Sequence, residues 1–173
     1  MAKAKATKTD QTEVARAMNA LRRMVRGLRA AAETVERDFK ISAAQLFVLS
    51  ELAQAPAQSV KDLAQVTMTT HSTVSQVVSQ LLAKGLISRS MDPDDARRSV
   101  LRPTRQGVSL LRRSPRAIQQ DLIEGFSALR PTERRNLARG LEKWLETSGL
   151  GAVPSAMLFE KPSRRKTDPD GAK

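Results

Sequence analysis

The sequence predicts a mainly α-helical fold that carries a single small β-hairpin. Three observations support this prediction. Apolar residues recur at alternating gaps of four and three over residues 12–39, the spacing of one face of a long helix. Two short segments further on each open with a serine that is followed, three residues later, by a side chain able to complete a capping box. Two strand-like stretches within residues 86–103 then flank a turn rich in aspartate.

The first helix is predicted over residues 12–38. Its apolar stripe consists of Val14, Met18, Leu21, Val25, Leu28, Ala32, Val35 and Phe39. At about 1.5 Å per residue such a helix extends roughly 40 Å, which is more than a small single domain covers. We therefore expect part of the stripe to contact a second copy of the chain, the alternative being a stripe that packs wholly within its own chain. The arginines beside the stripe are expected to be solvated, namely Arg16, Arg22, Arg23, Arg26 and Arg29.

Further helices are expected on both sides of the hairpin. Residues 42–55 and 59–65 each begin with a capping pair. Residues 108–130 have a helical pattern in which Pro115 introduces a kink or a break. A last helix over residues 131–149 opens with proline, which the first helical turn tolerates, and closes with glycine. The pattern as a whole gives six helices and one hairpin.

Residues 59–84 are the most informative stretch. A short helix and a turn lead into a second helix from about residue 70 to residue 84, whose apolar face consists of Val74, Val77, Val78, Leu81 and Leu82. The opposite face is polar and uncharged, and comprises His71, Ser72, Thr73, Ser75, Gln76, Ser79 and Gln80. Solvated helices normally carry Glu and Lys, whereas Gln, Ser and Thr suit close approach to base edges. The pattern predicts a helix–turn–helix that contacts a nucleic acid; a helix selected for solubility is the alternative.

The aspartate-rich turn lies inside a basic region. Residues 84–116 carry nine basic and three acidic side chains, so the region stays attractive to phosphate in spite of its acids. Asp95 can hold Arg97 by a short-range ion pair and orient its guanidinium. An arginine presented in this way suits a narrow minor groove, where the potential is most negative. The alternative is a solvated charged turn.

Composition narrows the class of protein. The chain has 30 basic and 18 acidic residues, and residues 12–159 alone keep 22 against 14, which favours a polyanionic partner. It has no cysteine and one histidine, His71, so that it lacks the residues for a cysteine-ligated or histidine-cluster metal site. No nucleophile–base pair or glycine-rich phosphate loop is present. We expect no enzyme activity, no cofactor and no metal.

The ends of the chain and its apolar runs bear on location. No apolar run approaches the roughly 18 residues that a membrane helix needs. Residues 1–11 contain lysines without a hydrophobic region behind them, so we expect a disordered basic tail rather than a secretory signal, and a cytoplasmic protein. Residues 150–173 form a C-terminal tail that we expect to be partly disordered, with residues 156–159 docked on the body.

The stretch "STVSQVVSQLLAKGLISRSMDPDDARRSVLRPTRQG" resembles the winged helix–turn–helix core of the MarR (multiple antibiotic resistance regulator) family. The family's wing signature, D-x-R-x-x-x-L-x-L-T-x-x-G, is matched at Asp95, Arg97, Leu101, Thr104 and Gly107. Two positions depart from the family pattern. Pro103 replaces the second leucine, which is expected to shorten the second wing strand, and Met68 replaces a glycine that is frequent in the turn between the helices.

The resemblance implies a single domain over residues 12–149. Dimerisation helices over 12–38 and 105–148 would surround a winged helix–turn–helix over 42–104. It also implies a homodimer that binds double-stranded DNA at a pseudopalindromic operator. By position, the major-groove contacts would come from Thr70, His71, Ser72, Thr73 and Gln76. The minor-groove and backbone contacts would come from the wing, through Arg97 and Arg98, with Asp95 orienting it.

The function implied by the resemblance is that of a transcriptional regulator, usually a repressor. Family members are often released from DNA by small aromatic or phenolic ligands, which bind between the dimerisation helices and the DNA-binding lobe. In this chain the cleft would involve the first two helices and the region near Pro115. Because the chain has no cysteine, a switch based on thiol oxidation is excluded. The alternatives are a sequence-indifferent basic nucleic-acid-binding or architectural protein, and a dimeric interaction module that no longer binds DNA.

Overall fold

The computed structural model describes residues 8–55, 59–92, 99–153, 157 and 158. These residues form seven helices and one two-stranded antiparallel sheet, so the predicted mainly α fold with a small hairpin is confirmed. The elements are α1 (Lys8–Phe39), α2 (Ala43–Gln54), α3 (Val60–Val66), α4 (His71–Ala83), β1 (Ile87–Met91), β2 (Ser99–Pro103), α5 (Arg105–Arg113), α6 (Ile118–Ser127) and α7 (Pro131–Thr147).

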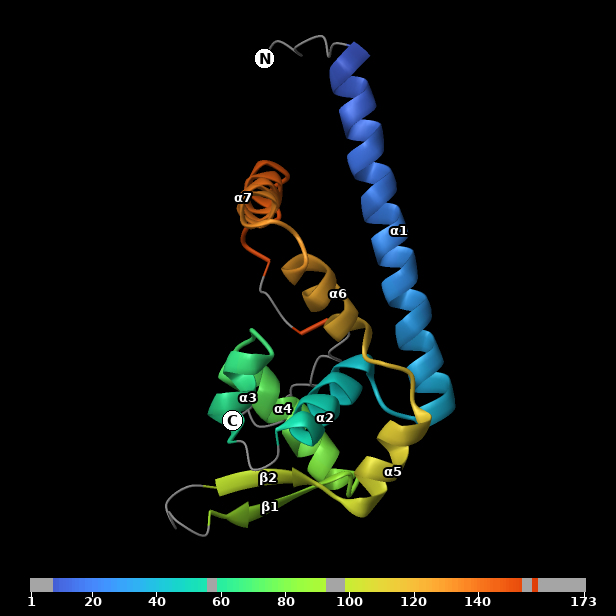
Figure 1. The fold of residues 1–173 in the computed structure, drawn as a ribbon, viewed down its shortest axis with the longest axis vertical. Coiled ribbons are helices and arrows are strands. Elements are labelled where there is room, and N and C mark those ends of the chain that lie inside the picture. The colour runs from blue at the N-terminus through green and yellow to red at the C-terminus, as the bar shows by residue number, and fades with distance from the viewer. Residues whose placement is uncertain (1–7, 56–58, 93–98, 154–156, 159–173) are drawn as a thin grey trace, which may run out of the picture.

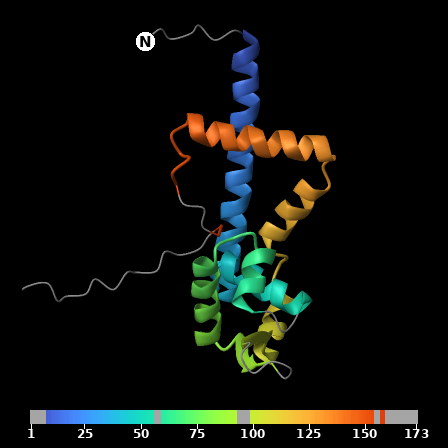
Figure 2. The ribbon, with the colours of Figure 1, turned by 90° about the vertical axis from the view of Figure 1, so that its left-hand side faces the viewer.

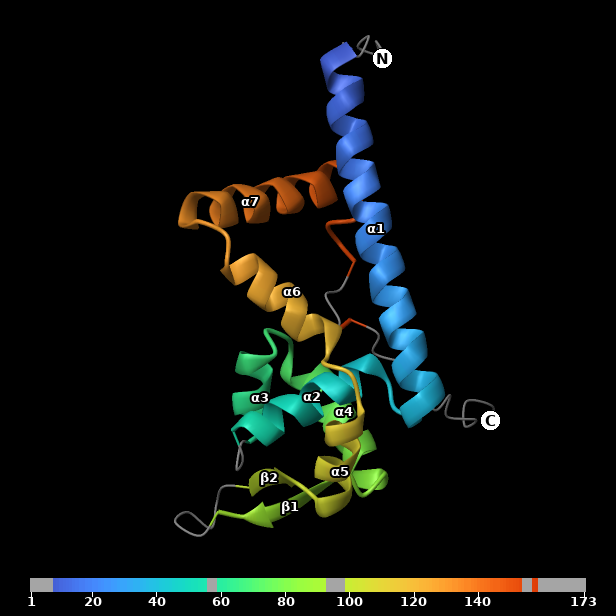
Figure 3. The same cartoon turned by 45° about the vertical axis from the view of Figure 1, so that its right-hand side comes forward.

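The molecule consists of a lobe and an arm (Figure 1). The lobe is made of α2 to α5 with the sheet. The arm is made of α1, α6 and α7: α1 runs along one side and extends well beyond the lobe, and α6 leads away from the lobe to α7 (Figure 3). Seen from the side, α7 lies across the direction of α1 (Figure 2). The lobe therefore carries the helix–turn–helix and the hairpin, at the opposite end of the molecule from the N-terminal half of α1.

The hydrophobic core lies in the lobe, around α2. Its side chains are buried almost all the way round, as expected for a helix enclosed by others. The capping box predicted at its start is confirmed, because the Gln45 amide donates to the Ser42 hydroxyl at 3.1 Å and the Ser42 amide donates to the Gln45 side chain at 3.2 Å. The largest side chains under 2 % exposed are Leu46, Phe47, Val48, Leu49, Leu52, Leu63, Val74, Val77, Val78, Leu81, Val100 and Leu101.

The described residues contain seven helices because Pro115 produces a break. α5 ends at Arg113, and Ser114 is extended with φ −83° and ψ 153°. A residue that precedes proline is pushed out of the helical region by the proline ring, and proline has no N–H to continue the helix. The expectation of six helices was wrong for this reason.

The hairpin strands pair in antiparallel register, with Ile87 opposite Pro103 and Met91 opposite Ser99. β2 ends at Pro103 and is as long as β1, so the expected shortening of the second strand by Pro103 stays a prediction. Pro103 is the last residue of a two-stranded sheet, where a missing N–H removes no further ladder hydrogen bond. The chain then continues into α5, and the Thr104 amide donates to the Leu86 carbonyl at 3.0 Å.

The apolar stripe of α1 is covered at one end only. Val35 is 3 % exposed, whereas Val14 is 61 % exposed. Leu21 and Val25, in the middle of the helix, are also exposed. The alternative in which the stripe packs wholly within its own chain is therefore wrong for the described residues, since the lobe covers only the C-terminal end of the helix.

Candidate nucleic-acid interface

The first helix of the helix–turn–helix, α3, is held by a capping box. The Asp62 amide donates to the Ser59 hydroxyl at 3.2 Å, and the Ser59 amide donates to the Asp62 carboxylate at 2.8 Å. Both predicted partners are therefore in contact. Leu63, one residue later, is fully buried and seats α3 on the core.

The turn between α3 and α4 keeps a glycine-like conformation without glycine. Met68 has φ +53°, in the left-handed region. The Met68 amide donates to the Gln65 carbonyl at 3.1 Å, and the Thr69 amide donates to the Ala64 carbonyl at 3.0 Å, which together form a Schellman motif. The α4 helix ends in the same motif, with Gly85 at the equivalent position and φ +65°. The departure at Met68 thus leaves the turn geometry intact.

Hydroxyl groups cluster at the N-terminus of α4. The N-cap residue is Thr70, whose side chain accepts from the Thr73 amide at 3.3 Å and donates to the Thr73 hydroxyl at 3.0 Å. The hydroxyls of Thr70 and Ser72 are also 3.0 Å apart. Thr70, His71 and Ser72 are exposed at this end of the helix, where free amide donors favour phosphate.

Two residues of the expected polar face point elsewhere. Thr73 is only 9 % exposed, so its predicted exposure was wrong: it lies one helical turn before the buried Val77 and shares that side of α4. Gln80 is half-buried, and its side-chain carbonyl accepts from the side-chain amide of Gln45 in α2 at 2.6 Å. The sequence pattern missed this contact, although the capping role of Gln45 already marked that side chain as an ordered one.

The rest of the polar face lies on α4, whose opposite side is packed in the core. Val74, Val77, Val78 and Leu81 are at most 1 % exposed and fix α4 in the core. On the other side, Ser79 is exposed, while Ser75 and Gln76 are half-buried. Figure 2 shows α4 at the outer edge of the lobe, rather than between other elements. The helix can therefore enter a groove without rearrangement of the core.

Three residues of the wing signature support the fold directly. Leu101 is 1 % exposed in the core. Thr104 caps α5, since its hydroxyl accepts from the Gly107 amide at 3.1 Å and donates to the Gly85 carbonyl at 2.7 Å. A Cβ atom on Gly107 would lie 2.1 Å from the Leu86 carbonyl oxygen, which leaves no room for a side chain. The signature is therefore in part a packing requirement of the strand-to-helix junction.

The tip of the wing, with Asp95, Arg97 and Arg98, lies outside the described residues, and its predicted role stays a prediction. The described base of the wing is nevertheless basic. Arg89 on β1, Arg102 on β2 and Arg105 at the start of α5 are all exposed, whereas the Lys84 ammonium group after α4 donates to the Lys40 carbonyl. In Figure 1 the two strands that carry Arg89 and Arg102 lie at the end of the lobe farthest from the arm, and α5 lies beside them. A polyanion on this end would meet hydroxyl and amide groups flanked by positive charge.

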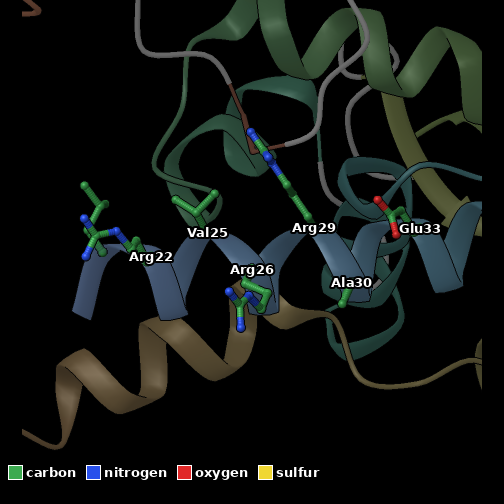
Figure 4. A pocket seen from close by; sticks show the side chains of 7 residues that line it. Arg22, Val25, Arg26, Arg29, Ala30 and Glu33 are labelled. Atoms are coloured by element: carbon green, nitrogen blue, oxygen red, sulfur yellow. The ribbon is translucent and has the colours of Figure 1, made fainter. Parts of the chain in front are cut away.

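Two cavities occur away from α4. One, of about 560 Å³, lies along α1 and is lined by Leu21, Arg22, Val25, Arg26, Arg29, Ala30 and Glu33 (Figure 4). The other, of about 360 Å³, lies between α2 and the α5–α6 connection and is lined by Leu46, Ser50, Ala53, Gln54, Leu111, Ser114, Pro115, Arg116, Ala117 and Gln120. Three of the arginines that were expected to be simply solvated thus line an open cavity beside apolar side chains.

Within the described part of the chain, no group of three or more His, Asp and Glu side chains is arranged to hold a metal ion. No helix in that part is both long and apolar enough to span a bilayer.

A helix–turn–helix followed by a two-stranded wing defines the chain as a winged helix–turn–helix protein. Residues 41–99 match the model of the MarR family. A putative transcriptional regulatory protein for the hcr operon of Thauera aromatica is 37% identical over 99 residues, which are 57% of this chain and 58% of that protein. The match thus spans a little over half of the relative's length.

Solved structures agree with this assignment over more of the chain. Bordetella bronchiseptica BpsR, whose DNA binding is described as regulated by 6-hydroxynicotinic acid, is 29% identical with a TM-score of 0.50, covering 75% of this chain and 98% of that one. MepR from S. aureus in complex with DNA is 26% identical with a TM-score of 0.51, covering 74% and 94%. Residues 41–99 are thus similar to the MarR family, and the fold of the chain is similar to that of these solved proteins. The chain's relatives are regulators rather than enzymes, in agreement with the prediction made from the residues.

Proposed function

We propose that the chain is a homodimeric, sequence-specific DNA-binding transcriptional regulator that acts in the cytoplasm as a repressor. The observation that carries the proposal is the polar, uncharged outer face of α4, held on a helix whose inner side chains are fully buried. His71, Ser72 and Gln76 would contact base edges, and the N-terminal hydroxyls and amides would contact phosphate. The DNA complex of MepR supports double-stranded DNA as the partner.

A homodimer is supported by apolar side chains that the arm leaves exposed. On α1 they are Val14, Leu21, Met24 and Val25, and on α6 and α7 they are Phe126, Leu137, Leu141, Trp144 and Leu145, each between 36 % and 61 % exposed. Neither α6 nor α7 has a buried residue of its own. Apolar surface on this scale is typical of a protein–protein interface, and a second copy offers the matching surface.

We further propose that residues 12–149 form one domain, in which some helices serve dimerisation and others DNA binding. Dimerisation would involve α1, α6 and α7, that is, residues 12–38 with the later part of 105–148. The winged helix–turn–helix over 42–104 would then be extended by α5, since Leu110 of α5 is 8 % exposed and Gly107 abuts Leu86. Twofold symmetry would place the two α4 helices in successive major grooves, about 10 base pairs apart.

Release by a small aromatic or phenolic ligand is the third part of the proposal. The cavity of about 360 Å³ between α2 and the segment around Pro115 has the size and mixed lining of a small-ligand site. It lies close to where the family resemblance places the ligand. Regulation of BpsR by 6-hydroxynicotinic acid supports a compound of this class.

Selection of bound fragments from random and genomic DNA tests the DNA-binding proposal. We expect enrichment of a pseudopalindrome with an affinity at least about a thousandfold above that of random DNA at physiological salt. Equal affinities for all sequences would instead identify a sequence-indifferent binder. A chain that ignores DNA altogether would be an interaction module.

Sedimentation at micromolar concentration tests the dimer. We expect a dimer for the wild type and a shift toward monomer for Leu141→Glu, which places a charge on the apolar side of α7. Asn136→Glu is the matched control, because it adds the same side chain at an exposed polar position of the same helix. Titration of the DNA complex with 6-hydroxynicotinic acid tests release. Ala53→Phe, which fills part of the cavity, should weaken any response.

A further inference from the structure

One buried core side chain comes from beyond the last helix. Met157 lies ten residues past the end of α7 and is only 4 % exposed. The other large apolar residues described after α7 are far more open: Leu150 is 52 %, Val153 64 % and Leu158 40 % exposed. Burial of a long, flexible side chain costs conformational entropy, so favourable packing contacts must compensate for that cost. Met157 therefore occupies a defined place in the packing.

That place is the joint between the lobe and the arm. In Figures 1 and 3 the short red segment with Met157 lies beside the top of α2 and near the start of α6. Met157 is part of the buried core cluster, which also includes Val35 of α1, Val48 of α2 and Ala117 just before α6; Ile123 of α6 is one of the half-buried residues that pack against this cluster. Methionine suits such a seat, because its unbranched chain fills irregular gaps between elements.

Among the described residues, few other fully buried side chains belong to the arm, although the Gln120 side chain of α6 donates to the Glu51 carboxylate of α2 at 3.1 Å. The N-terminal half of α1 is exposed, and α6 and α7 bury none of their own residues. The direction in which the arm leaves the lobe is thus set by a small group of side chains, of which Met157 is one. In a dimer joined through the arms, that direction determines the distance between the two α4 helices.

We infer that Met157 is a positioning residue for DNA binding. Its buried side chain packs where the lobe meets the arm, fixes the direction of the arm and thereby sets the spacing of the two recognition helices. The DNA part of this inference rests on the proposed function, whereas the seating of Met157 does not. Removal of this side chain lets the arm sample several directions. The apparent affinity for an operator of fixed spacing then falls in proportion to the fraction of molecules that keep the competent geometry.

Methionine oxidation tests the seating without any substitution. The native protein is exposed to hydrogen peroxide, and sulfoxide formation is followed at each methionine by peptide mass spectrometry. Met68 and Met91, which are 74 % and 73 % exposed, serve as internal controls. We expect Met157 to react roughly tenfold more slowly than either, because its sulfur is shielded. Oxidation of all three at the same rate would overturn the inference.

Three variants test the positioning role on the selected operator and on versions with one base pair added or removed between half-sites. Met157→Ala should bind the selected operator about tenfold more weakly and discriminate less between spacings. Met157→Leu, which conserves volume, should restore both properties. Leu158→Ala is the control at the neighbouring, exposed side chain and should match the wild type in operator affinity and in discrimination between spacings.

The outcomes are distinguishable. If Met157→Ala lowers only the melting temperature and keeps full spacing discrimination, Met157 is a stability residue and the positioning role is wrong. If Met157→Ala does not fold, Met157→Gln, which is similar in length, replaces it in the same comparison. If the wild type prefers no operator, the proposed function fails and the DNA role fails with it. Slow oxidation of Met157 would then still support its seat at the joint.

Discussion

The side-chain amide of Gln45 donates a hydrogen bond to the side-chain carbonyl of Gln80 at 2.6 Å, and this contact joins α2 to α4 across 35 residues of sequence. Gln45 is 5 % exposed, and its side-chain carbonyl accepts from the Ser42 backbone amide. One buried amide therefore caps α2 and fixes the C-terminal half of the proposed recognition helix. Gln80 acts as a tether of α4, not as part of the surface offered to DNA.

Gln80→Ala should destabilise the fold by about 1–3 kcal/mol, because it leaves the buried Gln45 amide without its acceptor. Urea unfolding of the purified protein measures the change. Ser79→Ala, at the exposed neighbouring position, is the control and should change stability by less than about 0.5 kcal/mol. Equal effects of the two substitutions would contradict the tether.

Met68→Gly should stabilise the fold by about 1 kcal/mol. A non-glycine residue in the left-handed region carries a steric penalty, and glycine removes it while adding some freedom to the unfolded chain. The melting temperature measures the gain. Gln65→Gly, in the last turn of α3, is the matched control and should lose about 1 kcal/mol, since glycine weakens a helix. A loss of stability in Met68→Gly would show that its side chain contributes more than the strain costs.

Gly107→Ala should destabilise the fold by about 3 kcal/mol or prevent folding. The new methyl group would meet the Leu86 carbonyl oxygen at 2.1 Å and the Leu49 side chain at 3.2 Å, and a backbone oxygen cannot move aside as a side chain can. Gly140→Ala, with nothing within 4 Å, is the control and should be neutral or slightly stabilising in its helix. The melting temperatures of both variants are measured by circular dichroism. A Gly107→Ala variant as stable as the wild type would contradict the close approach of Gly107 to the Leu86 carbonyl oxygen.

Gln76→Ala should relax the preference at one operator position by about 1–3 kcal/mol and leave the other positions unchanged. Arg102→Ala, at the exposed base of the wing, should weaken all sequences alike and reduce the salt dependence by about one phosphate contact. Competition binding on single-base operator variants at two salt concentrations separates the two effects. A uniform loss in Gln76→Ala would remove that side chain from base reading.

The stability that the Arg130–Glu133 contact gives to the start of α7 should decrease in acid. The Glu133 carboxylate accepts two hydrogen bonds from Arg130, one from its side chain at 2.5 Å and one from its backbone amide at 3.0 Å. These bonds favour the ionised carboxylate and hold the pKa of Glu133 below its ordinary value of 4.5. A depressed folded-state pKa stabilises above the unfolded value and loses that contribution as the pH falls through the folded pKa. The melting-temperature advantage of wild type over Glu133→Gln should thus be full near neutral pH and shrink below 4.5. An advantage independent of pH would contradict the contact.

Local patterns in the sequence were sufficient for the class of fold and the register of the helix–turn–helix. The capping boxes at Ser42 and Ser59 and the buried face of α4 follow from spacings within one or two helical turns, which depend little on the rest of the chain. The wing strands were placed within one residue for the same reason, whereas α5 begins at Arg105, three residues before the helical pattern predicted from residue 108. The proposed DNA contacts of Thr70, His71, Ser72 and Gln76 stay predictions.

The tertiary structure decided what depends on neighbours distant in sequence. A helical pattern cannot show that α2 lies against α4 and draws Gln80 inward, or that Thr73 turns to the buried side of α4. Only the packed chain shows that Gly107 abuts Leu86 and that, in the segment expected to dock on the body, Met157 is buried while Leu158 stays exposed. The physical reason is that spacing along one element specifies which residues share a face, whereas burial of that face depends on which other element packs against it.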